Sequence, residues 1–536
     1  MKSRRKGLLA VLIPVMLLAF AAAGYFIYME ADMSKAPDAG MVAADYMNAV
    51  CAGDAQAAAA ALDGGAALEP AAAPASDGGK RLYGALCASR SYKLDGACET
   101  KGRSAQQQLT VFVLDPEKLS SGLNAEVNAA LAELVAAAER SEDVYNADYS
   151  FKDETVERAY EQALGARLEN AAKYVSGASV TLELRYDRGR WTLQNGDELA
   201  TALLGRAASG DIDAEAEGLR AAATAELTYV RKIYTIEESA LSGRTPDPAL
   251  YGETDDPAVI EALLETPAAK QLIGERKMLW SRDIERIPGT GIRYYLDETI
   301  LTLVWQEVEA QAVGTFSEVI IADGSQLRRK IAGDSYGDFN FETTSDFAAD
   351  TNAVLALGGD FYNHGRSCGV VVYGREIYRF EPDTCDTCYI SADGDMLFSY
   401  RGQFTAQEEA QAFIEKNDVI FSLCFGPVLI DNGVDVTPEQ YQWGEVNDTY
   451  ARSALGMLGE RHYLTMNINC ELPDHYYLAT LRQAADAMLA RGCIKAYTLD
   501  GGQTATTVFN GQLINPVQFG VEKTISDIIY FATAKP

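Results

Sequence analysis

The chain has 536 residues, a length that predicts about three or four domains. Hydrophobic residues make up 48% and charged residues 23%, which excludes a disordered or collagen-like chain over most of the length. The 46 basic and 77 acidic residues give a formal net charge of −31. This excludes general nucleic-acid binding, because phosphate neutralisation needs a basic surface. Nine cysteines are too few for a disulfide scaffold, and an odd number leaves at least one thiol unpaired in a monomer.

The N-terminal 30 residues carry a targeting pattern. A basic block over residues 2–6 precedes the uncharged apolar run Gly7–Tyr28. As a helix, this run is about 33 Å long, enough to cross a bilayer core. The basic block favours a cytoplasmic N-terminus and an extracytoplasmic remainder of the chain. Cleavage after the small residues Ala21–Ala23 is one alternative. We favour an uncleaved single-pass anchor in the cell membrane, because Tyr25–Tyr28 continues the apolar run.

Residues 38–206 predict a small α+β domain. Helices are expected over Met41–Leu62 and from Leu123 to about residue 174. A β-hairpin is expected from the alternating strand Ser179–Tyr186 and the strand Trp191–Gln194. Helices followed by a hairpin with a tryptophan strand resemble the nuclear-transport-factor-two-like cone fold. The resemblance rests on element order and implies a spacer, a small binding domain or a protein-interaction domain.

A connector and a larger C-terminal domain follow. Residues 207–291 read as a helical connector, with a helix over Ala214–Ile233 and a turn-rich stretch over Leu241–Pro257. From Ile292 onward the pattern changes to short apolar strands. The predicted fold class is therefore multidomain α+β: a transmembrane helix, a cone-like α+β domain, a helical connector and a mixed-sheet α/β domain over 292–536.

Four short motifs in the C-terminal domain point to one family. They are Gly358–Tyr362, Phe425–Pro427, Arg452–Gly456 and Leu499–Gly502, in that order. With an Asn-Gly hairpin and a Ser-Asp pair near the end, they closely resemble phosphodiester glycosidases over about Tyr295–Ala534. That family includes the enzyme that removes N-acetylglucosamine from a phosphodiester, and exported bacterial proteins linked to exopolysaccharide. The resemblance implies hydrolysis of a sugar-1-phosphodiester.

The chain departs from the family pattern at several positions. Asn467–Cys470 stands where many members have an aspartate-glycine-arginine turn. Gly358 replaces a common asparagine, and Gln503 stands where a third glycine is frequent. Ser453 and Leu455 are mild changes. The missing turn removes a group that helps to hold the substrate in the family, so whether the activity is kept, altered, narrowed or lost stays open at this point.

The resemblance also assigns candidate site residues. Phosphate is a good leaving group, so stabilising the oxocarbenium-like centre and the phosphate charge matters most. Asp500 is the predicted base or stabilising carboxylate, Asp360 the second carboxylate and Arg452 the phosphate clamp. The predicted contacts to sugar or phosphate come from Gly358, Gly359, Gly501, Gly502, Thr504, Thr506 and Asn515. Each of these three residues also has a purely structural alternative: a turn residue for Asp500, a loop cap for Asp360 and an ion pair for Arg452.

No cofactor is predicted. A divalent cation near Asp360 and Asp500 has no support from ligand spacing, and the three histidines are scattered. Cys385 and Cys388 have redox or zinc spacing, but a loop disulfide or unpaired thiols fit the context better. Cys87 and Cys98 have the same two alternatives, a disulfide across a short loop or two unpaired thiols.

Two functions follow from these patterns. The first is a membrane-anchored extracytoplasmic glycosidase that cleaves sugar-1-phosphodiester linkages of envelope or secreted glycans, in the setting of exopolysaccharide. The alternative is a non-catalytic envelope protein that binds glycan or scaffolds an assembly through a degenerate glycosidase-like domain. The expected partners are a glycan or sugar phosphate and, through the N-terminal helix, the membrane. Neither sugar nor aglycone, nor a retaining or inverting outcome, follows from the sequence.

Overall fold

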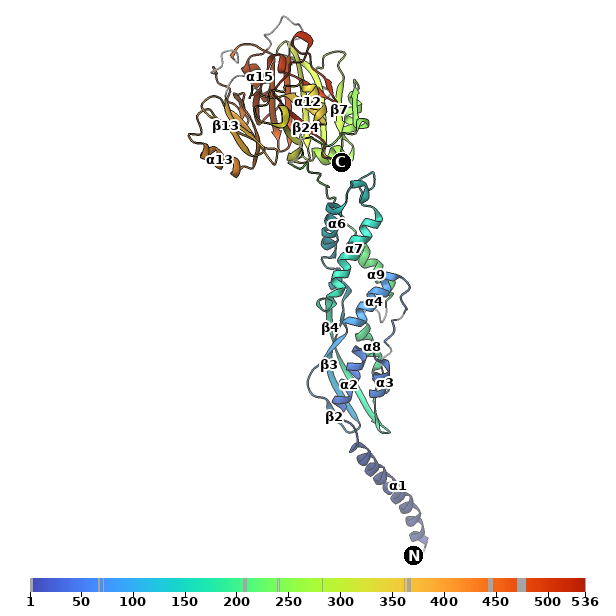
Figure 1. The fold of residues 1–536 in the computed structure, drawn as a ribbon. Helices are drawn as coiled ribbons and strands as arrows, with labels where there is room; N and C mark the ends of the chain where they lie inside the picture. Colours follow the sequence, from blue (N-terminus) through green and yellow to red (C-terminus); the bar gives the residue numbers. More distant parts are fainter. Residues whose placement is uncertain are drawn as a thin grey trace. The chain divides into compact units, whose positions relative to one another are not determined.

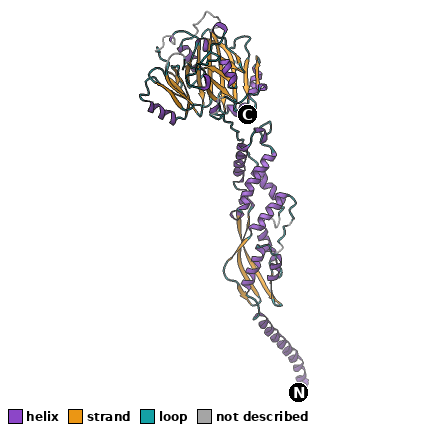
Figure 2. Cartoon of the chain, viewed as in Figure 1, coloured by secondary structure: helices purple, strands orange, loops and turns teal. Residues whose placement is uncertain are grey.

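The computed structural model divides into two compact units, Met1–Val230 and Arg231–Pro536, and each is described by itself (Figures 1 and 2). The structure describes the chain except for residues 1–2, 66–67, 71, 206–209, 239, 241, 282, 361, 364–367, 442–446, 470–478 and 536.

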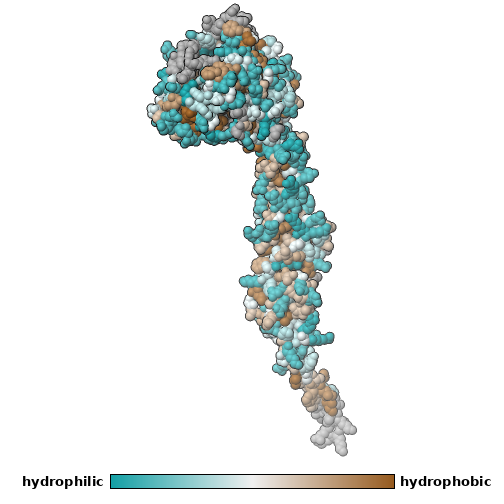
Figure 3. All heavy atoms as spheres, in the orientation of Figure 1, coloured by the Kyte–Doolittle hydropathy of each residue, from teal (hydrophilic) through white to brown (hydrophobic). Residues whose placement is uncertain are grey.

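A long N-terminal helix opens the first unit. α1 spans Ser3–Met33, and its stretch Ile13–Met33 is long and apolar enough to cross a membrane or to serve as a signal sequence. The large apolar side chains along its described part are exposed, and this part is mostly tan to brown in Figure 3. An apolar surface of this kind is stable only when lipid or another apolar partner covers it.

Short helices and one antiparallel sheet form the rest of the first unit. The sheet has the order β1-β3-β4-β5, with β2 paired to β3. The predicted hairpin is confirmed in β4 and β5. The elements are α2 (Ala39–Cys51), α3 (Ala55–Ala61), α4 (Asp77–Ser89), β1 (Ser91–Leu94), β2 (Glu99–Lys101), β3 (Ser104–Leu114), α5 (Pro116–Ser120), α6 (Leu123–Ala137), α7 (Asp153–Glu169), β4 (Val175–Asp187), β5 (Arg190–Leu193), α8 (Gly196–Leu204) and α9 (Ile212–Ala223).

Several predicted helices are shorter than the sequence suggested. The expected helix over Met41–Leu62 is two helices, because Gly53 takes a left-handed conformation and Asp54 caps the start of α3. The long region from Leu123 breaks after α6 and resumes at α7. α9 ends at Ala223, so the predicted continuation to residue 233 is not helical. At Gly53 and Asp54, the turn and the cap outweigh helix propensity.

The second unit consists mainly of strands. It contains two five-stranded sheets and one nine-stranded sheet, and the strand pairs described there are antiparallel. The sequence predicts a mixed-sheet α/β arrangement here; the helices lie beside antiparallel sheets in an α+β arrangement. The elements are β6 (Tyr251–Thr254), α10 (Pro257–Leu264), α11 (Pro267–Ile273), β7 (Ile292–Leu296), β8 (Ile300–Glu309), β9 (Ala312–Ile321), β10 (Leu327–Ile331), α12 (Thr344–Asp350), β11 (Ala353–Gly358), β12 (Gly369–Tyr373), β13 (Glu376–Glu381), β14 (Thr387–Ser391), β15 (Met396–Ser399), α13 (Gln407–Lys416), β16 (Val419–Leu423), β17 (Val428–Asp431), β18 (Val434–Asp435), β19 (Arg452–Gly459), β20 (His462–Asn469), α15 (Leu481–Ala490), β21 (Lys495–Leu499), β22 (Thr507–Phe509), β23 (Gln512–Leu513) and β24 (Asp527–Ala532).

The predicted connector over 207–291 does not form a separate body. α9 belongs to the first unit, whereas β6 extends the edge of the nine-stranded sheet by pairing with β7. Tyr234 and Ile236 are buried in the second unit against Phe347 of α12. The boundary between the two units therefore falls inside the range predicted as connector.

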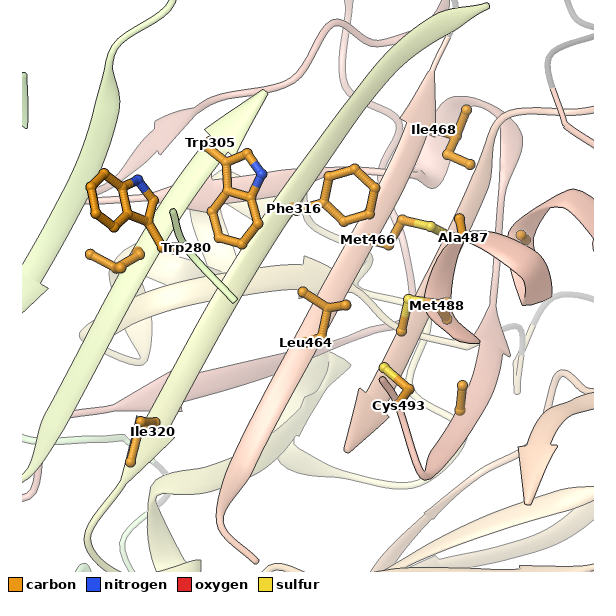
Figure 4. Close-up of a cluster of buried hydrophobic side chains, with 14 of the residues drawn as sticks. Trp280, Trp305, Phe316, Ile320, Leu464, Met466, Ile468, Ala487, Met488 and Cys493 are labelled. Carbon is orange, nitrogen blue, oxygen red and sulfur yellow. The ribbon is translucent and has the colours of Figure 1, made fainter. Parts of the chain in front are cut away.

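Two apolar cores hold the large sheet in place. On one face, Trp305, Phe316 and Met466 pack with Met488 of α15 (Figure 4). On the other face, side chains of all three sheets meet in one core, which includes Tyr463, Leu355 and Ile390. Alternation along each strand supplies both faces, because successive side chains point to opposite sides. These cores fix the strand ends, and the strand ends carry the predicted site residues.

Candidate functional site

The structure brings the loops carrying Asp360 and Asp500 together. β11 ends at Gly358, and the backbone amide of Gly358 donates to the carbonyl of Thr506 at 3.3 Å. The next amide, of Gly359, donates to the carbonyl of Asp527 at 3.0 Å, and the amide of Asp500 donates to the carbonyl of Gly359 at 3.2 Å. Three segments distant in sequence therefore meet where β11, β21 and β24 have their ends.

Glycines allow this close approach of backbones. A Cβ atom on Gly358 would lie 2.2 Å from the carbonyl oxygen of Thr504, and one on Gly359 would lie 2.0 Å from a carboxylate oxygen of Asp527. A Cβ on Gly501 would lie 2.3 Å from the carbonyl oxygen of Ala451. A side chain at these three positions would push the loops apart. The predicted ligand contacts of these glycines stay predictions.

Asp500 is a residue of this junction with intermediate overall exposure. Burial raises its pKa to about 6, and the charge of Asp360 adds to the rise. Hydrogen bonds from the Thr504 hydroxyl and the Gly501 amide, and the charge of Lys523, work in the opposite direction. A carboxyl group with a pKa near 6 is mostly ionised at neutral pH and still exchanges protons readily. This balance suits a group that accepts a proton from water.

Asp360 occupies a different environment, inside an ionic cluster with almost no exposure. Its Oδ1 accepts from Arg329 Nη2 at 2.7 Å and from the Tyr362 amide at 2.8 Å. Its Oδ2 accepts from the Cys424 amide at 2.5 Å. The same Arg329 Nη2 lies 3.0 Å from Asp527 Oδ2, and the three charged side chains are at most 1% exposed. Protein groups thus already bind both oxygens of Asp360.

The cluster pairs one buried cation with two carboxylates. Burial opposes the charged form of Arg329, but the attraction of Asp360 and Asp527 outweighs it and raises the pKa of the guanidinium. Burial and repulsion from Asp360 raise the pKa of Asp527 to about 7, although Arg329 works against this rise. Such a cluster persists only because each charge has partners, since an unpaired buried charge is costly.

Arg452, the predicted phosphate clamp, lies buried at the start of β19. Its Nε donates to the carbonyl of Ala479 at 2.9 Å, and its Nη2 donates to the carbonyl of Asp448. Burial lowers its pKa to about 10. The neighbouring Ala451 carbonyl accepts from the Gly502 amide at 2.9 Å, so Arg452 borders the loop of Asp500. Its guanidinium is engaged with backbone, and its contact to phosphate stays a prediction.

The remaining predicted contacts hold the loop that follows Asp500. The Thr504 hydroxyl donates to the carbonyl of Gly501 at 2.7 Å, and the Thr506 hydroxyl lies 2.6 Å from that of Thr344. Asn515 accepts from the Thr507 amide and donates to a carbonyl of the same loop. All of these side chains are buried. Their geometry is that of loop supports, and their role in binding a ligand stays a prediction.

The altered turn of the family pattern also supports this loop. Asn467 Nδ2 donates to the Thr507 hydroxyl at 2.5 Å, and Asn469 Nδ2 donates to the carbonyl of Ala505 at 2.9 Å. Both asparagines are fully buried at the end of β20. Cys470 lies outside the described residues. The two asparagines that replace the family's turn residues therefore hydrogen-bond the segment that follows Asp500.

The site prediction missed the charged residues Arg329 and Asp527. β10 alternates, with Leu327, Arg329 and Ile331 buried and the residues between them partly exposed. A charge on the apolar face of an alternating strand is the sequence signal for a buried ion pair. Ser526-Asp527 supported the family resemblance, but its charge was not assigned a role.

Metal ligands do not gather around this junction. Within the described part of the chain, no group of three or more His, Cys, Asp or Glu side chains has a metal-binding arrangement. His462 instead lies 2.8 Å from Glu318 in a buried pair, and His364 and His475 lie outside the described residues.

Comparison with known proteins agrees with the motif analysis. Residues 351–532 match the family model for phosphodiester glycosidases, which confirms the resemblance over that range. The SPbeta prophage-derived uncharacterized protein YomE of Bacillus subtilis (strain 168) is 23% identical over 201 residues, 36% of this chain. The match spans 30% of that relative's length.

Two solved structures show some similarity to the chain. The catalytic domain of zebrafish N-acetylglucosamine-1-phosphodiester alpha-N-acetylglucosaminidase, auto-inhibited by its pro-peptide, is 17% identical with a TM-score of 0.37. It covers 47% of this chain and 86% of that one. A hypothetical protein from Synechocystis is 15% identical with a TM-score of 0.36, covering 47% of this chain and 64% of its own.

Proposed function

We propose that the second unit is a hydrolase that cleaves the bond between the anomeric carbon of a sugar and a phosphodiester oxygen. The single observation that carries the proposal is the position of Asp500. It is a residue of intermediate exposure whose carboxyl group has a raised pKa, and it lies at the meeting point of three strand ends, inside the range that matches phosphodiester glycosidases. A perturbed carboxylate at such a convergence is a good candidate for acid–base chemistry.

The proposed reaction needs one proton acceptor and a stabilised phosphate. The C1–O bond breaks, its electron pair leaves with the phosphate, and the sugar passes through an oxocarbenium-like state. Water adds to C1, and Asp500 takes its proton. The products are the free sugar and a phosphate monoester. Because phosphate leaves readily, this scheme requires no strong general acid.

Lys523 is the proposed cation for the departing phosphate. It is exposed, and its positive charge acts on Asp500. The other two charged residues predicted for the site already have protein partners. Arg452 donates to backbone carbonyls, and Asp360 forms an ion pair with Arg329. We therefore place Asp360 with Arg329 and Asp527 as the rigid support of the site, with Asp500 as its reacting carboxylate.

The proposed setting is the cell envelope. The apolar stretch of α1, preceded by basic residues, supports anchoring in the membrane with the bulk of the chain outside. The proposed substrates are then envelope or secreted glycans that contain sugar-1-phosphodiesters.

A non-catalytic glycan-binding module is the second candidate. The observation that favours it is that protein groups already occupy both carboxylate oxygens of Asp360 and two donors of Arg452. Such a module binds a sugar phosphate without turnover.

The test is release of free sugar from an N-acetylglucosamine-1-phosphodiester of a small alcohol by the purified full-length chain in detergent. The Asp500→Asn variant is expected to lower the rate by at least about 100-fold, the usual size of a lost acid–base group. Asp393→Asn, a carboxylate in an exposed turn with 91% side-chain exposure, is the matched control and retains the full rate. Equal rates for Asp500→Asn and the unchanged chain would remove Asp500 from the chemistry. Binding without release would favour the second candidate.

A further inference from the structure

Three buried cysteines meet beside the ionic cluster, and their thiols have no role in the proposed reaction. They converge on Gly369, the first residue of β12. A Cβ atom there would lie 2.8 Å from the sulfur of Cys424 and 3.0 Å from the sulfur of Cys385. Cys368 directly precedes this glycine, and its thiol donates to the carbonyl of Cys424 at 3.1 Å. All three cysteines are at most 1% exposed.

Within this group, Cys368 and Cys385 are joined by a contact between their side chains. Their thiols are hydrogen-bonded, and this contact, followed by burial, raises the pKa of Cys385 well above its ordinary value. The thiol of Cys424 points elsewhere, to the carbonyl of Val370 at 3.4 Å. The backbone brings the pair together as well, because the Gly369 amide donates to the hydroxyl of Thr384, the residue before Cys385, at 2.8 Å.

The neighbouring Cys388 is not part of this group. It lies on β14 and packs in the core shared by the three sheets, whereas Cys385 packs with Cys368 and Cys424. The sequence spacing of Cys385 and Cys388 suggests a pair within one loop, but the two side chains enter different cores.

We propose that Cys368 and Cys385 are a disulfide-forming pair, oxidised by the disulfide of a thiol oxidoreductase or a small disulfide such as oxidised glutathione. One thiolate attacks the acceptor's disulfide and releases one thiol; the second cysteine then displaces the second thiol. The two cysteines lose two electrons and two protons, and the acceptor disulfide becomes two thiols.

The timing of this oxidation follows from the burial of the pair. Exchange requires a thiolate in contact with the oxidant, and the folded protein offers neither at Cys385. The bond therefore forms while the chain folds. Once formed, it resists reductants until the second unit opens.

The bond would tie together two segments of the second unit. Cys368 ends the segment that leaves Asp360, and Cys385 begins a turn whose next residue is Asp386. The carboxylate of Asp386 accepts from the Val428 amide at 3.2 Å, and its carbonyl accepts from the Tyr497 hydroxyl at 2.8 Å. A Cys368–Cys385 bond thus joins the Asp360 segment to the loop before β17. This proposal depends on these contacts and not on the catalytic assignment.

The test uses the full-length chain refolded with oxidised glutathione, then alkylated in denaturant without reductant and mapped by peptide mass spectrometry. The expected result is one linked peptide pair containing Cys368 and Cys385, with Cys388 and Cys424 alkylated. Cys388→Ala, the matched buried control in the same Cys-x-x-Cys segment, keeps this link; Cys385→Ala loses it.

Thermal unfolding of the unchanged chain provides a second readout, which does not depend on whether a variant folds. Reduction is expected to lower the Tm of the unchanged chain and of Cys388→Ala by about 5 °C, since the bond closes a loop of seventeen positions. Reduction leaves the Tm of Cys385→Ala unchanged. Full alkylation of every cysteine in the refolded chain, or a dominant link from Cys368 or Cys385 to Cys424, would overturn the proposal.

Discussion

The two units place their charges differently. In the first unit, ion pairs such as Arg140–Asp143 lie at the surface, with 67% and 40% of the side chains exposed. In the second unit, Arg329, Asp360 and Asp527 form an ionic cluster that is almost fully buried. Burying charges costs several kcal/mol per ion before their attraction offsets it. The comparison teaches that the second unit maintains an expensive arrangement beside Asp500, as expected of a preorganised site, whereas each described ion pair of the first unit keeps at least one partly exposed side chain.

The largest expected effect comes from removing the buried cation. Arg329→Met leaves two carboxylates facing each other in an apolar interior, and it is expected to lower the free energy of unfolding by about 3–5 kcal/mol. Urea unfolding followed by tryptophan fluorescence measures this change.

The matched control is a surface arginine of the first unit. Arg140→Met breaks an exposed pair and is expected to cost less than about 1 kcal/mol. If the two variants lose equal stability, the buried cluster is not the costly element described here, and the contrast between the units disappears.

A second contrast uses glycines. Gly359→Ala is expected to destabilise the second unit by about 1–3 kcal/mol, because the new Cβ would lie 2.0 Å from Asp527 Oδ2. Gly84→Ala, in the exposed face of α4 with nothing within 4 Å, is expected to stabilise the first unit by up to about 1 kcal/mol. Thermal unfolding of the two variants gives opposite signs. A neutral Gly359→Ala would show that the loops at the junction adapt easily.

The smallest expected effect is in the pH dependence of the proposed activity. With the pKa of Asp500 near 6, its ionised fraction, and so the rate, rises about tenfold from about pH 5 to about pH 7. Thr504→Val removes a hydrogen bond that lowers this pKa, so the rise moves to higher pH. If the pH–rate profile of Thr504→Val is unchanged, the group that titrates in this profile is not Asp500.

The same shift has a defined effect on stability. The pKa of Asp500 is higher in the folded chain than its ordinary value of 3.8, so ionisation opposes folding. Its contribution to the free energy of unfolding is complete below about pH 4 and is lost as the pH rises through about 6. Comparing the pH dependence of unfolding for the unchanged chain and Asp500→Asn isolates this contribution.

Local patterns in the sequence predicted the strands and motifs well, because they depend on neighbouring residues. Alternation identified the hairpin of β4 and β5, and the Asn510-Gly511 turn correctly predicted β22 and β23. Helix ends were less predictable: Gly53 divides a continuous alanine-rich pattern, and its effect depends on a left-handed conformation. The motif order identified the family range that the comparison confirms.

Long-range partners could not be predicted in the same way. Arg329 and Asp527 are 31 and 167 positions away from Asp360 in sequence, so no local spacing reveals them as its partners. The sequence around Arg452 likewise does not show that its guanidinium donates to backbone carbonyls. These features arise when sheets pack and bring strand ends together, and they decide which of the predicted charges remain available to a substrate.

The most direct test of the central claim is the position of isotope after turnover in ¹⁸O-labelled water. Cleavage of a sugar-1-phosphodiester by the full-length chain is predicted to place ¹⁸O on C1 of the released sugar, with none in the phosphate monoester, as mass spectrometry of both products measures. Incorporation of ¹⁸O into the phosphate would mean that the phosphorus–oxygen bond breaks, and it would contradict the glycosidase assignment.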